Sequence, residues 1–209
     1  MKRKINYIAK LPYLLLTIAI VAPLILPTST LAAGAKKVAR VIILRGDVTT
    51  KGSKDSTTQK LERGMWLNEG ATVKTAARSF AKLLFLDKSQ INVGPRSQMV
   101  ISKFPKKKAG IITLLKGELR AKVSKNYMQI KDKEKSKLFI KTKSAALGVR
   151  GTDFQVLYNV RNRITSLVTF EGRVAMAKIS EAMNRRQLQN QNALEKLVSS
   201  KTAVIVKRG

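Results

Sequence analysis

Short apolar segments separated by turns recur through most of this 209-residue chain, and they limit its fold more than any other feature. Val, Ile, Leu and Phe dominate the segments, and Gly, Asp, Asn or Pro commonly stands between them. In Asp153–Val160 apolar and polar residues alternate, which is the period of a strand with one buried face. Many short strands at regular spacing predict an all-β fold, either a barrel, a β-sandwich or a β-helix-like stack.

The expected strands follow one another from residue 41 onward. Lys116-Gly117 separates two of them and is expected to form the turn of a hairpin. The predicted strands are Val41–Leu44, Ala71–Thr75, Ser79–Leu86, Ile91–Val93, Met99–Ile101, Ile111–Leu115, Glu118–Val123, Leu138–Thr142, Asp153–Val160, Ile164–Phe170 and Arg173–Ile179.

Alternation within the strands indicates which side chains enter the core. In Ile164–Phe170 the side chains of Ile164, Val168 and Phe170 share one face. Because the strand phenylalanines continue such patterns, we expect them to be buried. They are Phe80, Phe85, Phe139, Phe154 and Phe170.

One late segment has the features of a helix. Ser180–Ser200 contains no Gly or Pro, begins with a serine, and carries Glu181 in what would be its first turn. Its leucines and Val198 form a partial apolar stripe. We predict one α-helix over residues 180–200 and a terminal strand within residues 201–209.

The N-terminus has the order of a secretory signal. Met1–Lys10 is basic, Leu11–Pro27 is apolar and uncharged, and small residues follow. We expect residues 1–33 to be a signal peptide, with an uncleaved anchor as the alternative. The apolar run is shorter than the roughly 20 residues that a spanning helix needs. In either case we expect the rest of the chain to lie outside the cytoplasm, in the periplasm or cell envelope of a bacterium.

Composition excludes several kinds of chemistry. The chain has no cysteine and no histidine, so it has no disulfide, thiol nucleophile, imidazole base or ordinary zinc site. Ser79 and Lys82 match the S-x-x-K pattern of serine acyltransferases. That chemistry needs one helix face, whereas strand residues three apart point to opposite faces. We therefore expect a non-enzymatic protein without cofactor or metal.

Positive charge dominates the sequence. The 42 Lys+Arg and 12 Asp+Glu residues give a net charge of +30, which favours anionic partners. After export these include cell-wall polymers and lipopolysaccharide; we expect no sequence-specific nucleic-acid binding, because the aromatic residues fit strand patterns. The candidate anion-binding residues are Lys106, Lys107, Lys108, Lys131, Lys133, Lys135 and Lys137.

An ordered set of motifs resembles the FecR domain, an extracytoplasmic all-β module of bacteria. The set opens with Arg45-Gly46-Asp47-Val48 and continues through Gly64-Met65-Trp66-Leu67. Its most specific parts are Val149-Arg150-Gly151-Thr152 followed by Phe154, and Glu171-Gly172 followed by Val174. The resemblance implies one FecR-like β domain over residues 41–179. The family-motif residues, expected to act structurally, are Gly148, Val149, Arg150, Gly151, Thr152, Phe154, Glu171 and Gly172.

Arg150 leaves two roles open. Its guanidinium group could bind carbonyls, Asp153 or Glu171 within the fold, or it could hold an external carboxylate or phosphate. Because the motif lies among apolar strands, we expect the internal role.

The resemblance also implies a signalling role. Its best-known members carry a receptor's signal across the inner membrane to a sigma factor, through a cytoplasmic region before a transmembrane helix. Only Met1–Lys10 precedes the apolar run here, so we expect the fold to carry over but not the sigma-factor regulation. The sequence predicts an exported binding or signalling module that contacts an envelope protein or an anionic polymer. The alternative is a structural periplasmic protein that binds cell-wall or lipopolysaccharide anions. Contact with a membrane is expected only through an uncleaved N-terminus.

Overall fold

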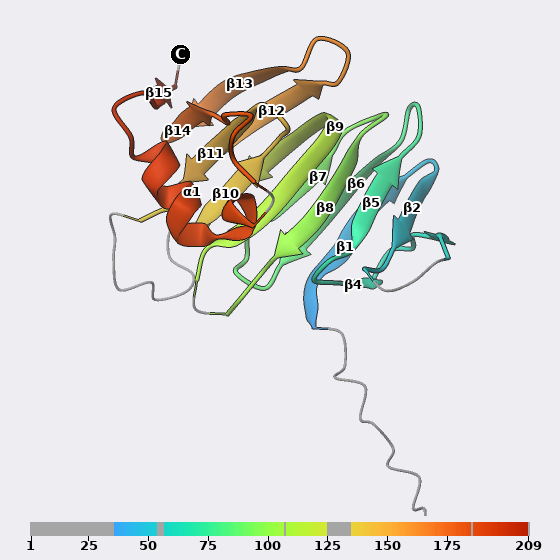
Figure 1. The fold of residues 1–209 in the computed structure, drawn as a ribbon. Coiled ribbons are helices and arrows are strands. Elements are labelled where there is room, and N and C mark those ends of the chain that lie inside the picture. The colour runs from blue at the N-terminus through green and yellow to red at the C-terminus, as the bar shows by residue number, and fades with distance from the viewer. Residues whose placement is uncertain (1–35, 54–56, 107, 125–134, 185, 209) are drawn as a thin grey trace, which may run out of the picture. The chain divides into compact units, whose positions relative to one another are not determined.

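The computed structural model describes residues 36–53, 57–106, 108–124, 135–184 and 186–208. The signal-peptide prediction therefore lies outside the described residues. Strands dominate the described chain, which confirms the all-β fold with one late helix (Figure 1). None of the helices in these ranges is long and apolar enough to cross a membrane.

The strands form two layers, which we call sheet I and sheet II. In sheet I the order is β4 (Trp66–Asn68), β1 (Lys37–Arg45), β6 (Phe80–Phe85), β7 (Gln90–Val93), β9 (Gly110–Lys122), β12 (Asp153–Asn159) and β13 (Ile164–Glu171). In sheet II the order is β3 (Gln59–Lys60), β2 (Val48–Lys51), β5 (Thr72–Thr75), β8 (Gln98–Lys103), β9, β10 (Leu138–Lys141), β11 (Ala145–Val149), β14 (Arg173–Lys178) and β15 (Val204–Lys207). The arrangement is a sandwich whose layers share β9.

The shared strand β9 corrects the predicted hairpin. Lys116 still pairs with β8 in sheet II, whereas Gly117 pairs with Tyr158 of β12 in sheet I. Gly117 has φ +81°, which bends the strand without reversing it. A glycine at positive φ is compatible with either a hairpin turn or a bend within one strand. The pairing of β9 with β8 and β12 decides between them, and β12 is distant in sequence.

The main core lies between the two sheets. Inward side chains alternate along β6, β12 and the first part of β8, where every second residue is buried. Phe85 and Phe154 are buried there as expected, and Phe139 is buried on the other side of sheet II. Such alternation buries one face of each strand and leaves the other face available.

Buried hydroxyl groups hold the places where the chain passes from one sheet to the other. The Ser97 hydroxyl accepts a hydrogen bond from the Glu118 amide at 2.8 Å and donates to the Pro95 carbonyl at 2.9 Å. The Ser79 hydroxyl likewise accepts from the Asp47 amide at 2.9 Å and donates to the Ala77 carbonyl at 3.0 Å. A Cβ at Gly46 would lie 2.3 Å from the Ser79 hydroxyl, and one at Gly117 would lie 2.3 Å from the Ser97 hydroxyl, so these corners leave no room for side chains there.

Ser79 therefore has a structural place in the fold. It is 2% exposed and sits in the corner between β1 and β2, whereas Lys82 lies on the half-buried side of β6. A hydroxyl that already accepts one backbone hydrogen bond and donates another is fully occupied by the corner.

The late helix is shorter than expected. Helix α1 spans Gln191–Val198, and a short 3₁₀ turn, η1, spans Gln187–Gln189. At the start of this region, the Asn184 side chain accepts from the Gln187 amide and the Gln187 side chain accepts from the Asn184 amide, both at 2.9 Å. This reciprocal pair caps a helical N-terminus at Asn184, so the predicted start at Ser180 is wrong. Asn190 caps α1 by accepting from the amides of Asn192 and Ala193.

Helix α1 covers part of the outer face of sheet II. Leu194 and Val198 pack against Phe139, Ala146 and Ala177 in a second, smaller core. The terminal strand β15 then adds to β14 at the end of sheet II. Sheet II is thus partly covered on its outer side.

Candidate functional site

The outer face of sheet I exposes apolar side chains that sequence alternation assigned to the core. In β13, Ile164 is 54% exposed, Val168 55% and Phe170 39%. Phe80 on β6 is also only half-buried. The expectation that Phe80 and Phe170 belong to the core is therefore wrong, because the strands present these rings on the side away from sheet II.

Hydrogen bonds fix this orientation of β13. Thr165 points inward, where its hydroxyl pairs with that of Thr142 at 2.7 Å and that of Ser144 at 2.8 Å. Thr169 is buried, and its hydroxyl donates to the Val206 carbonyl at 3.3 Å. Because neighbouring strand residues face opposite sides, the inward threonines force Val168 and Phe170 outward.

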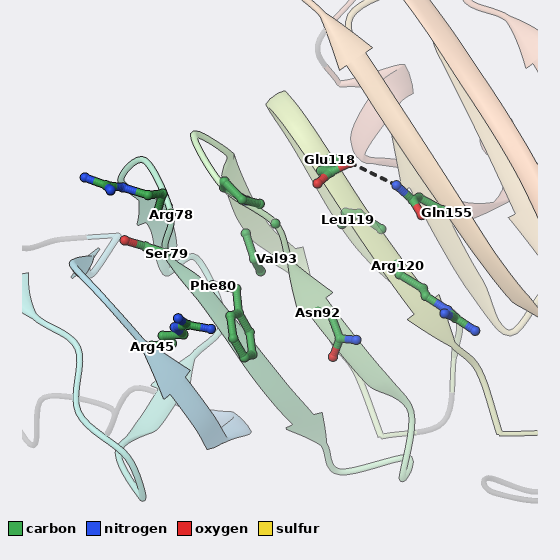
Figure 2. Close-up of a pocket in the computed structure, with 12 residues that line it drawn as sticks. Arg45, Arg78, Ser79, Phe80, Asn92, Val93, Glu118, Leu119, Arg120 and Gln155 are labelled. Carbon is green, nitrogen blue, oxygen red and sulfur yellow. Dashed lines mark hydrogen bonds between the residues drawn. The ribbon is translucent and has the colours of Figure 1, made fainter.

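A shallow hollow of about 550 Å³ lies on the same face, over β6, β7 and β9 (Figure 2). Phe80 lines it beside Arg45 and Arg78, which come from the ends of β1 and the β5–β6 connection. Across the hollow, the Gln155 side chain donates to the Glu118 carboxylate at 2.9 Å. The hollow therefore joins an aromatic ring, free guanidinium groups and a carboxylate that already has a partner.

Arg120 links this hollow to β13. Its guanidinium group donates two hydrogen bonds to the Asp153 carboxylate, each 2.9 Å long, and lies 4.3 Å from the centre of the Phe170 ring. The hydrogen bond from Arg120 lowers the pKa of Asp153 below its usual value, and the same bond raises the pKa of Arg120. At neutral pH the Asp153 carboxylate is thus ionised, with its charge balanced by Arg120. The ring of Phe170 lies beside the same Arg120 cation.

Asn92 adds an unused acceptor to the face. It lines the hollow on β7, and its side-chain oxygen is buried without a hydrogen-bond partner. An unpaired buried oxygen is costly to the fold.

The family-motif residues lie where the chain passes between the sheets. Gly148 and Val149 end β11 in sheet II, and Phe154 lies in β12 of sheet I, with Arg150, Gly151 and Thr152 between them. Glu171 and Gly172 form the opposite passage, from β13 to β14. The two passages touch, because a Cβ on Gly172 would lie 2.8 Å from the Thr152 methyl carbon.

Arg150 contacts neither of the carboxylates considered from the sequence. Its guanidinium group lies 3.7 Å from the Glu195 carboxylate of α1, while Asp153 binds Arg120. Gly148 lies under the same helix, since a Cβ there would come 2.7 Å from Val198. The sequence offered no signal for this contact, because α1 lies outside the shared motif pattern.

The structure brings two of the basic runs to one end of sheet II. Lys106 and Lys108 precede β9, and Lys135 and Lys137 precede β10. Since β9 and β10 run parallel and the Gly110 amide donates to the Lys137 carbonyl at 3.2 Å, the two runs meet. Lys107, Lys131 and Lys133 lie outside the described residues. Of the described lysines, Lys106, Lys108, Lys135 and Lys137 do not line the sheet I hollow, whose arginines the sequence did not single out.

The described residues contain no group of three or more Asp or Glu side chains that could hold a metal ion. What they do contain is a two-layer all-β domain with one appended helix, corner motifs at the sheet crossings and one uncovered sheet face. The profile of the family described as FecR protein matches residues 71–175, half of the chain. The chain therefore belongs to the FecR family.

Comparison with solved structures gives a distant likeness. Two crystal structures of a candidate anti-sigma factor from Parabacteroides distasonis ATCC 8503, at 1.65 and 2.50 Å resolution, each share 11% sequence identity with this chain. Each match has a TM-score of 0.45 and covers 66% of this chain. The chain spans about half the length of these proteins, 51% in each case. No curated protein matches the sequence.

Proposed function

We propose that this chain is an exported, non-enzymatic binding and signalling module that docks an envelope protein on the outer face of sheet I. The observation that carries the proposal is the orientation of strand β13. Its threonines point inward, whereas Val168 and Phe170 point outward. Exposed apolar side chains gathered on one face are typical of protein-binding sites. Membership in the FecR family supports a regulatory role.

Charge on the face indicates the chemistry of the partner. Arg45 and Arg78 line the hollow beside Phe80, and Lys82 lies in the neighbouring hollow with Arg120. The carboxylates of Glu118 and Asp153 already have partners. A partner surface with apolar groups and unpaired carboxylates would complement this face. The apolar part would make the complex resistant to salt, because burial of apolar area is not screened.

The alternative is a structural protein that binds cell-wall or lipopolysaccharide anions. The meeting of two lysine runs at one end of sheet II and the net charge of +30 favour it. Such binding would be mainly electrostatic and would weaken steeply as salt rises.

A pull-down from envelope extract separates the two functions. The tagged chain is incubated with extract and washed at low and then high salt. We expect a discrete protein to survive the high-salt wash, and the double variant V168S/F170S to lose it. The control V204S removes another exposed valine from β15, outside sheet I, and should retain the partner.

Three results would contradict the docking of a protein on sheet I. These are recovery of only glycan or lipid, loss of all bound material on raising salt, and equal losses from V168S/F170S and V204S. The first two would support the structural alternative.

A further inference from the structure

A second hollow lies beside the start of α1 and shares no lining residue with the sheet I hollow. It has a volume of about 460 Å³. Three parts of the chain form it: the end of β8 with the β8–β9 connection, the segment around η1, and the first residues of α1. Its lining residues are Lys103, Lys108, Arg186, Gln189, Asn190, Gln191 and Asn192.

The charged side chains that line this hollow are all positive. Lys103, Lys108 and Arg186 are exposed, and no carboxylate lines the hollow. Within the part of the chain that the structure describes, these three cations form no ion pair, whereas Arg120, Arg150 and Arg163 each do. Three unpaired cations around one concavity attract an anion more strongly than single lysines on an open surface.

The remaining lining consists of side-chain amides. Asn190 is engaged as the helix cap, accepting from the Asn192 amide at 2.9 Å, and Gln191 donates to the Ala109 carbonyl. The side chains of Gln189 and Asn192 also line the hollow. Because the capping oxygen of Asn190 satisfies the first amides of the helix, the site depends on side chains and not on the helix terminus.

These two kinds of group fit one class of ligand. Amide side chains both donate and accept, as sugar hydroxyl groups do, while lysine and arginine bind phosphate or carboxylate oxygens. We propose that this hollow binds an anionic sugar unit, that is, a sugar bearing a phosphate or a carboxylate. This site is independent of protein docking on sheet I.

Isothermal titration calorimetry on the full chain at low salt tests the proposal. The probes are glucose 6-phosphate, glucuronate and glucose, with inorganic phosphate and acetate as the bare anions. We expect saturable binding of at least one anionic sugar and no detectable binding of glucose. Glucose 6-phosphate should bind about tenfold tighter than inorganic phosphate, or glucuronate about tenfold tighter than acetate. The stronger of the two sugar probes identifies whether phosphate or carboxylate is preferred.

Substitutions locate the binding. K103Q and R186Q should each weaken the preferred anionic sugar about tenfold. The matched control K60Q removes the same charge from β3, at the far edge of sheet II, and should change affinity less than twofold. In N192A the affinity of the sugar probe should fall toward that of its bare anion. The affinity of the bare anion should stay unchanged. Thermal melting of each variant verifies that it folds.

Several outcomes would overturn the proposal. They are the absence of saturable binding, equal affinity for the sugar probe and its bare anion, and equal losses from K60Q and K103Q. Because only small probes are used, any of these would leave protein docking on sheet I untouched.

Discussion

Single hydroxyl groups stabilise the corners of this fold, and Ser97 gives the sharpest test. Substitution S97A would leave the Glu118 amide without the acceptor that now lies 2.8 Å away. Since an unpaired buried donor costs about 1–3 kcal/mol, we expect S97A to lower the free energy of unfolding by that amount. Urea denaturation measures it. The control S166A removes an exposed hydroxyl from β13 and should stay within about 0.5 kcal/mol of the parent; a similarly small loss in S97A would contradict the role of Ser97.

Asp153 gives the fold a defined response to acid. Its pKa is lowered in the folded state, first by the hydrogen bond from Arg120, so its ionised form favours folding. This contribution is complete above the unfolded value of 3.8 and is lost as pH falls below 3.8 through the lower folded pKa. Because Arg120 is nearly half exposed, the pair contributes on the order of 0.5 kcal/mol.

The variant D153N should therefore be less stable than the parent at pH 7, and the difference should vanish at pH 2. Chemical denaturation at both values measures this. A difference that persists unchanged at pH 2 would show that packing, and not the ionised carboxylate, accounts for the loss.

At the scale of elements, strand β9 depends on the backbone of Gly117. A Cβ at this position would lie 2.3 Å from the Ser97 hydroxyl and 2.6 Å from the Ser97 Cα, and its φ is +81°. The variant G117A thus combines backbone strain with a clash against main chain. We expect a loss of about 3 kcal/mol or more, measured as free energy of unfolding.

Glycine 64 offers a matched control for this prediction. Gly64 has a similar φ of +87°, but a Cβ there would meet only the Arg40 side chain at 3.7 Å. G64A therefore tests backbone strain alone and should cost about 1–2 kcal/mol. If the two alanine variants lose the same stability, the close packing of Gly117 against Ser97 is not important to the fold.

The same elements show how far the sequence predicts this structure. Alternation placed Phe154 and Val156 in the core and located most strands, because it follows from local geometry alone. It could not distinguish the bend at Gly117 from a hairpin. It also assigned the wrong side of β13 to the core, since the hydrogen bonds that turn Thr165 inward come from the β10–β11 loop. The candidate binding face is thus the place where local patterning and tertiary structure disagree.

At the scale of the whole molecule, net charge should make stability depend on salt. The chain carries 42 basic and 12 acidic residues, so repulsion among its cations opposes the compact state. The ion pairs of Arg150 and Arg163 are long, at 3.7 and 3.6 Å, and therefore offset little of this repulsion. Raising sodium chloride from 10 to about 150 mM screens the repulsion over roughly 8 Å.

We therefore expect the melting temperature to rise by several degrees over this range of salt, with about 2–4 °C for each kcal/mol gained. Differential scanning calorimetry measures the rise, and potassium chloride at equal ionic strength should reproduce it because screening depends on charge alone. A melting temperature that falls with salt would mean that attractive ion pairs outweigh the repulsion.

Sodium phosphate at equal ionic strength provides a further comparison, since additional stabilisation in the parent that K103Q lacks would indicate anion binding beside α1 beyond general screening.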